Sequence, residues 1–170
     1  CVCVCRLSSY ISHSTFPHPY HILHTQVLLG FLKSDNSIRS AFAAEIIGKG
    51  FDLWRPYIQN LKALIRRLLV LTIPSSSRSA GLGGASVVAA AQRALMEIGQ
   101  REPLIFVNAT GREILRPDVG SRHHCTALLA LVALVNKYPA PLLRHLPAVV
   151  EAVIRSLDPS EPELRKGCLK

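Results

Sequence analysis

The stretch Leu32-Lys33-Ser34-Asp35-Asn36-Ser37-Ile38-Arg39 decides the fold, because a phrase of the same kind returns near the end of the chain. The second phrase is Leu157-Asp158-Pro159-Ser160-Glu161-Pro162-Glu163-Leu164-Arg165. Each follows an apolar stretch with helical spacing, and each joins a Ser-containing acidic turn to an aliphatic-Arg pair that opens a second helix. Self-similarity of this kind is typical of an α-solenoid, an array of helical hairpins built to present surface rather than to enclose a catalytic site.

An acidic residue followed four positions later by an arginine occurs three times, and the spacing between these pairs sets the repeat length. The arginines are separated by 83 and 43 residues. This fits a period of about 42, within the HEAT/armadillo range of about 40–47 residues. We expect the acid to cap the second helix of a hairpin and the arginine to pair with a carboxylate or carbonyl between repeats. The pairs are Asp35 with Arg39, Asp118 with Arg122, and Glu161 with Arg165.

The sequence therefore predicts an all-α fold, an α-solenoid of about four HEAT/armadillo-like hairpins within residues 23–170. The hairpins are expected at 24–50, 51–101, 102–138 and 139–170. The missing acid–Arg phrase would fall near the Ser/Gly-rich stretch 74–84, which we interpret as an irregular loop that replaces the short turn. Residues 1–22 have no helical periodicity and are expected to form a poorly ordered tail. We interpret the whole chain as a fragment of a longer protein.

The basic charge of the chain permits an anionic partner but does not point to one. The 170 residues carry a net charge of +9, with 49% hydrophobic and 18% charged residues, which is the composition of a folded domain. Nucleic acid or an anionic membrane surface is one interpretation. A scattered basic surface is the favoured one, because no Arg/Gly tract or basic-aromatic stretch occurs, and nucleic acid is not expected as a partner. The densest basic group is Lys62 with Arg66 and Arg67, expected on the solvent side of one helix.

The cysteines and the hydropathy pattern favour a reducing, cytoplasmic setting. Five cysteines, three of them crowded at positions 1, 3 and 5, do not form a disulfide framework. Cys125 and Cys168 lie in apolar helical contexts and are expected in the core. No stretch of about 18 uncharged apolar residues occurs, so no transmembrane helix is predicted.

No constellation of residues rises above chance as a catalytic, metal or cofactor site, and the chain is expected to be no enzyme and to need no cofactor. Gly81-Leu82-Gly83-Gly84 lacks the lysine of a phosphate-binding loop and is interpreted as a linker. His123, His124 and Cys125 are adjacent on a helix, where neighbours point about 100° apart. They are expected to face solvent or a neighbouring repeat. The Cys and His residues of the tail lack the spacing of a zinc site.

Trp54 and Arg55, in Phe51-Asp52-Leu53-Trp54-Arg55-Pro56-Tyr57, complete the candidate interaction surface with Lys62, Arg66 and Arg67. A single tryptophan beside Arg and Tyr could anchor an interface. Packing within the core or between repeats is the favoured alternative.

Residues 25–170 resemble the C-terminal helical region of the WD-repeat protein 7/rabconnectin-3 beta-type family, especially its fungal members. The resemblance rests first on 37–51 with Leu53-Trp54-Arg55-Pro56-Tyr57-Ile58. The later stretches that add to it are 89–99, 103–106 with 110–114, and 142–160. The Leu-Trp-Arg-Pro-Tyr phrase is the most specific part, since HEAT-like hairpins in general share the Asp/Arg pattern.

The resemblance implies a non-enzymatic, cytoplasmic scaffold that is peripheral on endomembranes and carries WD repeats outside this region. Its implied partners are a rabconnectin alpha-type subunit and subunits of the vacuolar proton-pumping ATPase, in pump regulation and vesicle trafficking. The alternative is a generic HEAT/armadillo adaptor, of transport-receptor or phosphatase-scaffold type, that grips acidic partners through Lys62, Arg66 and Arg67.

Overall fold

The computed structural model describes residues 19–73, 82–116 and 118–156, and every element within these ranges is helical, with no strand. The all-α prediction is therefore confirmed for the described chain. The elements are α2 (Pro19–Leu32), α3 (Ser37–Lys49), α4 (Phe51–Trp54), the 3₁₀ turn η2 (Arg55–Tyr57), α5 (Leu61–Thr72), α7 (Leu82–Arg101), α8 (Pro103–Ile114), α9 (Ser121–Lys137), α10 (Pro139–Leu142), the 3₁₀ turn η3 (Leu143–His145) and α11 (Leu146–Ser156).

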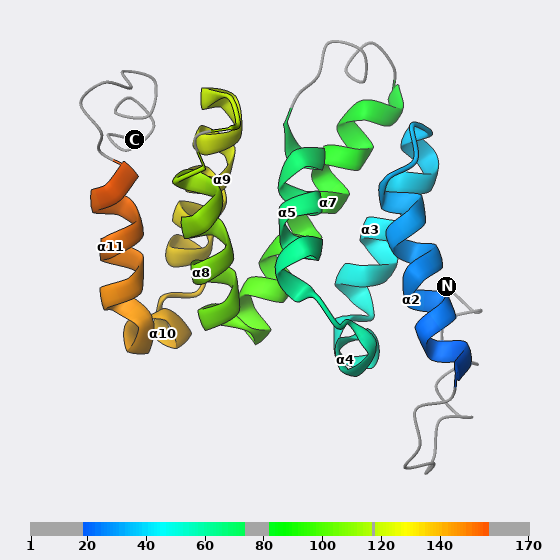
Figure 1. The fold of residues 1–170 in the computed structure, drawn as a ribbon, viewed down its shortest axis with the longest axis horizontal. Coiled ribbons are helices and arrows are strands. Elements are labelled where there is room, and N and C mark those ends of the chain that lie inside the picture. The colour runs from blue at the N-terminus through cyan, green and yellow to red at the C-terminus, as the bar shows by residue number, and fades with distance from the viewer. Residues whose placement is uncertain (1–18, 74–81, 117, 157–170) are drawn as a thin grey trace.

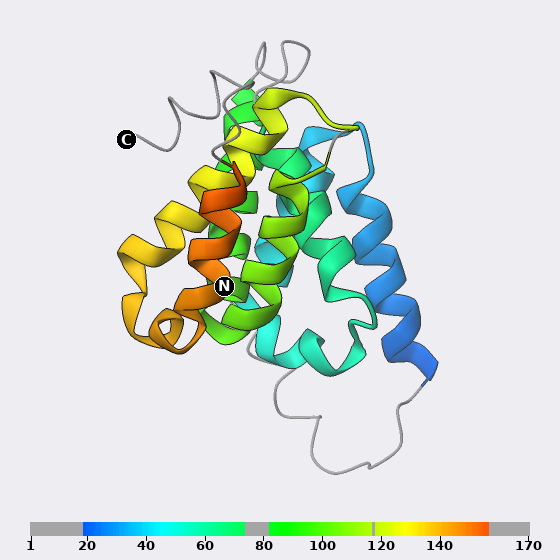
Figure 2. The same cartoon turned by 60° about the vertical axis from the view of Figure 1, so that its left-hand side comes forward.

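The helices pack in two layers. Within each hairpin α2 contacts α3, α5 contacts α7, and α8 contacts α9. The first helices follow one another, α2 against α5, α5 against α8 and α8 against α11, and Figure 1 shows these four in a row from one end of the molecule to the other. The second helices do the same, α3 against α7 and α7 against α9. Figure 2 shows the stack from a second direction.

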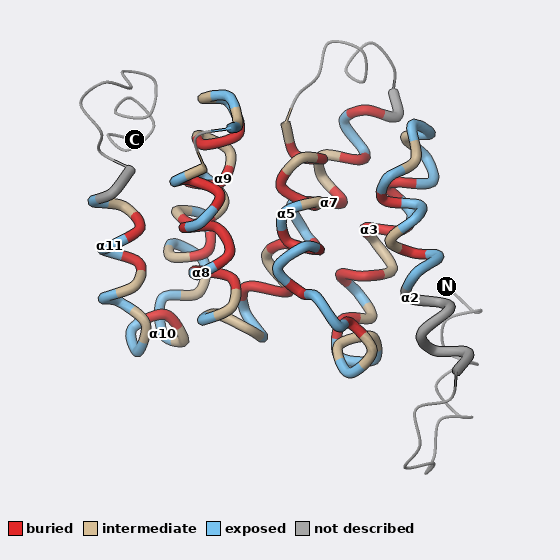
Figure 3. Tube along the Cα trace, in the orientation of Figure 1, coloured by how far each residue is buried: buried red, intermediate tan, exposed pale blue. Residues whose placement is uncertain are grey.

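One hydrophobic core runs through the described helices (Figure 3). In α5 the buried positions recur at helical spacing, as the sequence pattern predicts, and include Leu61, Leu64, Leu68 and Thr72. Between α3 and α7 the core is built from small residues instead. A Cβ on Gly48 would lie 3.0 Å from the Cα of Ala94, so the two backbones approach closely there because residue 48 has no side chain.

The helix starts correct the role expected for the repeated acidic residues. Asn36, not Asp35, caps α3: its Oδ1 accepts hydrogen bonds from the backbone N–H groups of Ile38 and Arg39, at 3.0 and 3.2 Å. The residue before α9 is Gly120, which offers no side-chain cap. Asp118 lies two positions before it and binds Arg116 instead. The capping prediction was therefore wrong for both acids.

The arginines of the repeated pairs do not connect the repeats either. Arg39 and Arg122 are both exposed, and neither makes an ion pair with another described residue. Glu161 and Arg165 lie outside the described residues.

The Asn36 cap gives a direct test of this correction. Asn36→Ala is expected to lower the free energy of unfolding by about 1 kcal/mol, because two N–H groups at the start of α3 lose their acceptor. Asp35→Ala, at the neighbouring exposed position, should leave it unchanged. Urea unfolding of the two variants beside the parent measures the difference, and equal losses would restore Asp35 as the capping residue.

Two predicted boundaries also differ from the structure. Helix α2 begins at Pro19, inside the expected tail of residues 1–22, because proline suits the first turn of a helix, where its missing N–H costs nothing. Helix α7 begins at Leu82, so Leu82, Gly83 and Gly84 are helical rather than part of the 74–84 loop. Near Pro56 the helix is interrupted, since α4 ends at Trp54 and η2 follows.

The last described helices carry an apolar stripe that is not fully used by the core. Leu142 and Val149 are buried, whereas Leu143, Leu146, Val150 and Ile154 are 67%, 51%, 44% and 62% exposed. Among the described residues no single helix is long and apolar enough to cross a membrane. One pair of consecutive described helices, Ser121–Lys137 with Pro139–Ile154, is long and apolar enough when taken together, but the two are bent by 113° at their junction.

Candidate functional site

The predicted basic surface does not form a set of free cations on one face. Lys62 and Arg66 are exposed on α5, as predicted. Arg67 is partly buried, and its Nε donates a hydrogen bond to the carbonyl oxygen of Leu32 at 3.0 Å, which ties α5 to the end of α2. The sequence could not show this, because the acceptor is a backbone group 35 positions away.

Trp54 and Arg55 contribute mainly to packing. Trp54 is partly buried and packs against the core, and its indole nitrogen lies 2.8 Å from the position that a Cβ on Gly50 would take. Arg55 donates from Nε to Glu102 Oε1 at 2.6 Å, which joins η2 to the residue before α8. Of the five predicted surface residues, Lys62 and Arg66 are thus the exposed ones.

A buried polar network at the junction of α5, α8 and α9 was missed by the sequence analysis. Its centre is Glu113, whose side chain is 9% exposed. Glu113 Oε2 lies 3.2 Å from Arg116 Nη1 and 2.9 Å from His123 Nε2, and Oε1 lies 3.6 Å from Arg66 Nε. The contact with His123 joins α9 to α8, and the contact with Arg66 joins α8 to α5.

His123 and His124 are buried, at 6% and 9% exposure, so of the two expected alternatives, solvent or a neighbouring repeat, the first is wrong. His124 Nε2 donates to the carbonyl oxygen of Arg116 at 2.7 Å. Its Nδ1 is buried and has no hydrogen-bond partner among the described residues. The two rings point to different acceptors, as the angular separation of adjacent helical residues requires. The signal in the sequence was the His-His pair directly before an apolar helix, but nothing local identified Glu113 as its partner.

Arg116 holds the edge of this network through the exposed Asp118. Arg116 Nε donates to Asp118 Oδ1 at 2.8 Å, and a second contact joins its Nη2 to Oδ2. The hydrogen bond from Arg116 lowers the pKa of Asp118, and the same bond raises the pKa of Arg116. The chemistry of the set is that of a structural clamp, with the cations and the carboxylate already paired with each other.

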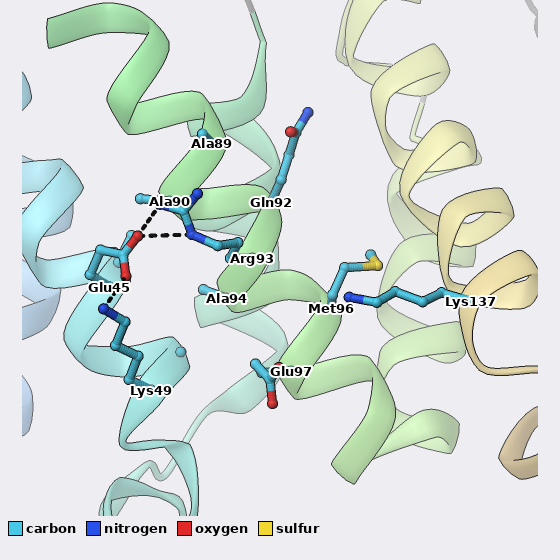
Figure 4. A pocket seen from close by; sticks show the side chains of 12 residues that line it. Glu45, Lys49, Ala89, Ala90, Gln92, Arg93, Ala94, Met96, Glu97 and Lys137 are labelled. Carbon is cyan, nitrogen blue, oxygen red and sulfur yellow. Dashed lines mark hydrogen bonds and ion pairs between the residues drawn. The ribbon is translucent and has the colours of Figure 1, made fainter.

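A groove of about 610 Å³ lies over α3, α7 and the end of α9 (Figure 4). Small residues of α3 and α7 line it, including Ala44, Gly48, Ala90 and Ala94, and Lys137 reaches toward it from α9. Among its charged lining residues, Glu45 accepts a hydrogen bond from Arg93 Nε at 2.9 Å and lies 3.2 Å from Lys49 Nζ. The hydrogen bond from Arg93 lowers the pKa of Glu45.

The Glu45 pair gives a pH prediction with a definite sign. Since its folded-state pKa is lowered, the stabilisation is present above the ordinary value of 4.5 and is lost as the pH falls through the folded-state pKa. We expect that in Glu45→Gln the free energy of unfolding falls less on acidification than in the parent. The difference should be under about 1 kcal/mol, because the side chain of Arg93 is largely exposed. Unfolding free energies across the acid range measure it. Glu97→Gln, which removes a carboxyl that makes no ion pair among the described residues, is the control and should keep the parent's profile.

Within the described ranges, no group of three or more His, Cys, Asp or Glu side chains is placed to hold a metal ion. Cys125 is partly buried rather than in the core. Comparisons with protein-family models, with curated proteins and with solved structures found no match to this chain.

Proposed function

We propose that this chain is a non-enzymatic α-solenoid segment that serves protein–protein assembly. The observation that carries the proposal is the two-layer order of the helices, in which first helices contact first helices and second helices contact second helices along the chain. Stacked hairpins of this kind bury one face of each unit against the next and leave a long surface for partners.

The resemblance to the WD-repeat protein 7/rabconnectin-3 beta-type family supplies the biological role that we propose. On this proposal the segment belongs to a cytoplasmic scaffold that binds a rabconnectin alpha-type subunit or subunits of the vacuolar proton pump, and acts in pump regulation and vesicle trafficking. The phrase that carries this part is Leu53-Trp54-Arg55-Pro56-Tyr57-Ile58. Trp54 and Arg55 then act through the rigid packing of α4 and η2 against the core and α8, rather than as a free surface.

The assembly role is tested by capture with the purified chain as bait. The expected result is retention of a purified rabconnectin alpha-type subunit or of proton-pump subunits. Arg55→Ala, which breaks the link from η2 to Glu102, should reduce retention, and Arg112→Ala, at an exposed position on α8, should not. Failure to retain any of these proteins, with the parent chain shown to be folded by circular dichroism, would contradict the pump-linked role.

A generic adaptor that binds acidic partners is the second candidate. Lys62 favours it, because this side chain is exposed on α5 and makes no ion pair with another described residue. Arg66 is exposed one turn further along, although its Nε also lies 3.6 Å from Glu113 Oε1. Lys62→Glu should then weaken retention of the chain on a column that carries an acidic peptide, and Arg112→Glu should not. If the two charge reversals weaken retention equally, retention depends on the net charge of the chain rather than on this face of α5.

A further inference from the structure

The corner between α2 and α3 presents large apolar side chains to solvent. Phe31 lies in the last turn of α2, and Ile38 and Phe42 lie in the first two turns of α3. Their exposures are 37%, 74% and 62%. Ile38 and Phe42 are one helical turn apart, so they share a stripe of α3 that faces away from its buried side. Figure 1 shows the short connection between α2 and α3 at one end of this hairpin.

This corner is held firmly by hydrogen bonds. Ser40 Oγ donates to the carbonyl oxygens of Phe31 and Ser34, at 3.0 and 2.9 Å. Asn36 caps α3 through two further bonds, and Arg67 Nε binds the Leu32 carbonyl. The apolar side chains are therefore exposed on a fixed turn, and a partner would not have to order the backbone first. Pre-organisation of this kind reduces the entropic cost of binding.

Cations flank the apolar side chains of the corner. Lys33 and Arg39 are exposed and make no ion pair with other described residues, and Asp35 is the single acid of the turn. Further along α3, Glu45 is matched by Arg93 and Lys49, so this face of the hairpin has an excess of positive charge. The chain as a whole carries +9.

We propose that the α2–α3 corner, made of Phe31, Lys33, Ile38, Arg39 and Phe42, docks on an anionic lipid bilayer. The apolar side chains enter the boundary between headgroups and acyl chains, and the two cations meet the lipid phosphates and carboxylates. A bilayer fits better than a protein partner because the corner is the tip of a helical hairpin. A protein would need a matching groove, whereas a bilayer accepts protruding side chains directly. The proposal stands apart from the assembly role, and either can fail without the other.

The test is co-sedimentation of the 170-residue chain with vesicles of phosphatidylcholine alone and of phosphatidylcholine with phosphatidylserine. Binding is expected for the anionic vesicles only. Ile38→Ser with Phe42→Ser should weaken it by about tenfold or more, because two large side chains no longer enter the bilayer. Lys33→Glu with Arg39→Glu should weaken it by about tenfold or more as well, through loss and reversal of two charges near the surface.

The matched controls are exposed residues elsewhere in the array. Leu129→Ser on α9 and Arg112→Glu on α8 change the same kinds of side chain and should bind like the parent. Circular dichroism of every variant checks the fold, which these exposed positions should not disturb.

Three outcomes would overturn the proposal. The first is no binding of the parent chain to anionic vesicles. The second is loss of binding in Lys33→Glu with Arg39→Glu but unchanged binding in Ile38→Ser with Phe42→Ser. The contact would then be purely electrostatic, with no side chain inserted in the bilayer. The third is an oligomer of the parent chain in free solution that dissociates in the Ile38→Ser variant, because the corner would then be an interface between copies.

Discussion

Replacing Glu113 by alanine is expected to lower the free energy of unfolding by about 3 kcal/mol or more, the largest single effect we predict outside the apolar core. Glu113 and His123 are both almost fully buried, and their side chains are 2.9 Å apart. Removing the carboxyl group leaves the buried His123 Nε2 without its hydrogen-bond partner and takes a partner from Arg116 and Arg66. A buried polar group left unpaired costs its full desolvation.

A double variant distinguishes the loss of the Glu113–His123 interaction from the effect of changing position 113 alone. Glu113→Leu with His123→Leu removes both polar groups at once and should be less destabilised than Glu113→Ala alone, because apolar replacement of a buried pair is tolerated better than its disruption. Chemical unfolding of the parent, of the single variants Glu113→Leu and His123→Leu, and of the double variant gives the coupling energy. Glu97→Ala, a half-buried carboxylate of α7 with no ion pair among the described residues, is the control and should cost little. A Glu113→Ala loss no greater than that of the control would show that the network does not stabilise the α8–α9 junction.

Gly48→Leu is expected to lower the free energy of unfolding by about 2–3 kcal/mol. The reason is the close approach of α3 and α7: a Cβ at position 48 would lie 3.0 Å from the Ala94 Cα and 3.3 Å from its Cβ. The obstructing atoms include backbone, so they cannot move aside as the end of a flexible side chain could. The strain exceeds the gain in helix propensity of about 1 kcal/mol that replacing glycine brings.

Gly30→Leu is the matched comparison, because nothing lies within 4 Å of a Cβ at position 30. There the propensity gain is unopposed, and the variant should be slightly more stable than the parent, by up to about 1 kcal/mol. Thermal unfolding followed by circular dichroism compares the two. Parallel shifts of both variants in the same direction would contradict the close packing of α3 on α7.

The predictions that were correct concern residues close together in the chain, and those that failed concern residues far apart in it. The helical character of the described chain was predicted correctly, since apolar spacing such as that of Leu61, Leu64 and Leu68 sets the buried face of a helix locally. Turn chemistry is also local, and the Ser34–Ser37 segment was correctly placed as a helix start. Whether Asp35 or Asn36 caps α3 depends on a shift of one position in the helix start, and both residue types suit that place, so the pattern of residue types does not distinguish them.

The contacts that form the candidate site could not be predicted in the same way. Arg55 and Glu102 are 47 positions apart, and Arg93 and Glu45 are 48 positions apart. Each pairing exists only because helices from different hairpins meet at a particular height. The repeated acid–Arg spacing suggested inter-repeat pairs at Arg39 and Arg122, but the packing supplied other arginines for that role.

By itself the sequence determined that the described part of the chain is helical and where helices such as α3 and α5 form along it. These properties follow from contacts between residues three or four positions apart, which the order of residue types fixes. Only the tertiary structure decided that His123 and His124 are buried, that Arg67 is used within the fold, and that Phe31, Ile38 and Phe42 remain exposed at one corner. The physical reason is that burial depends on which helix packs alongside, and the acid-turn-Arg phrase around residues 32–39 carries no information on its neighbour.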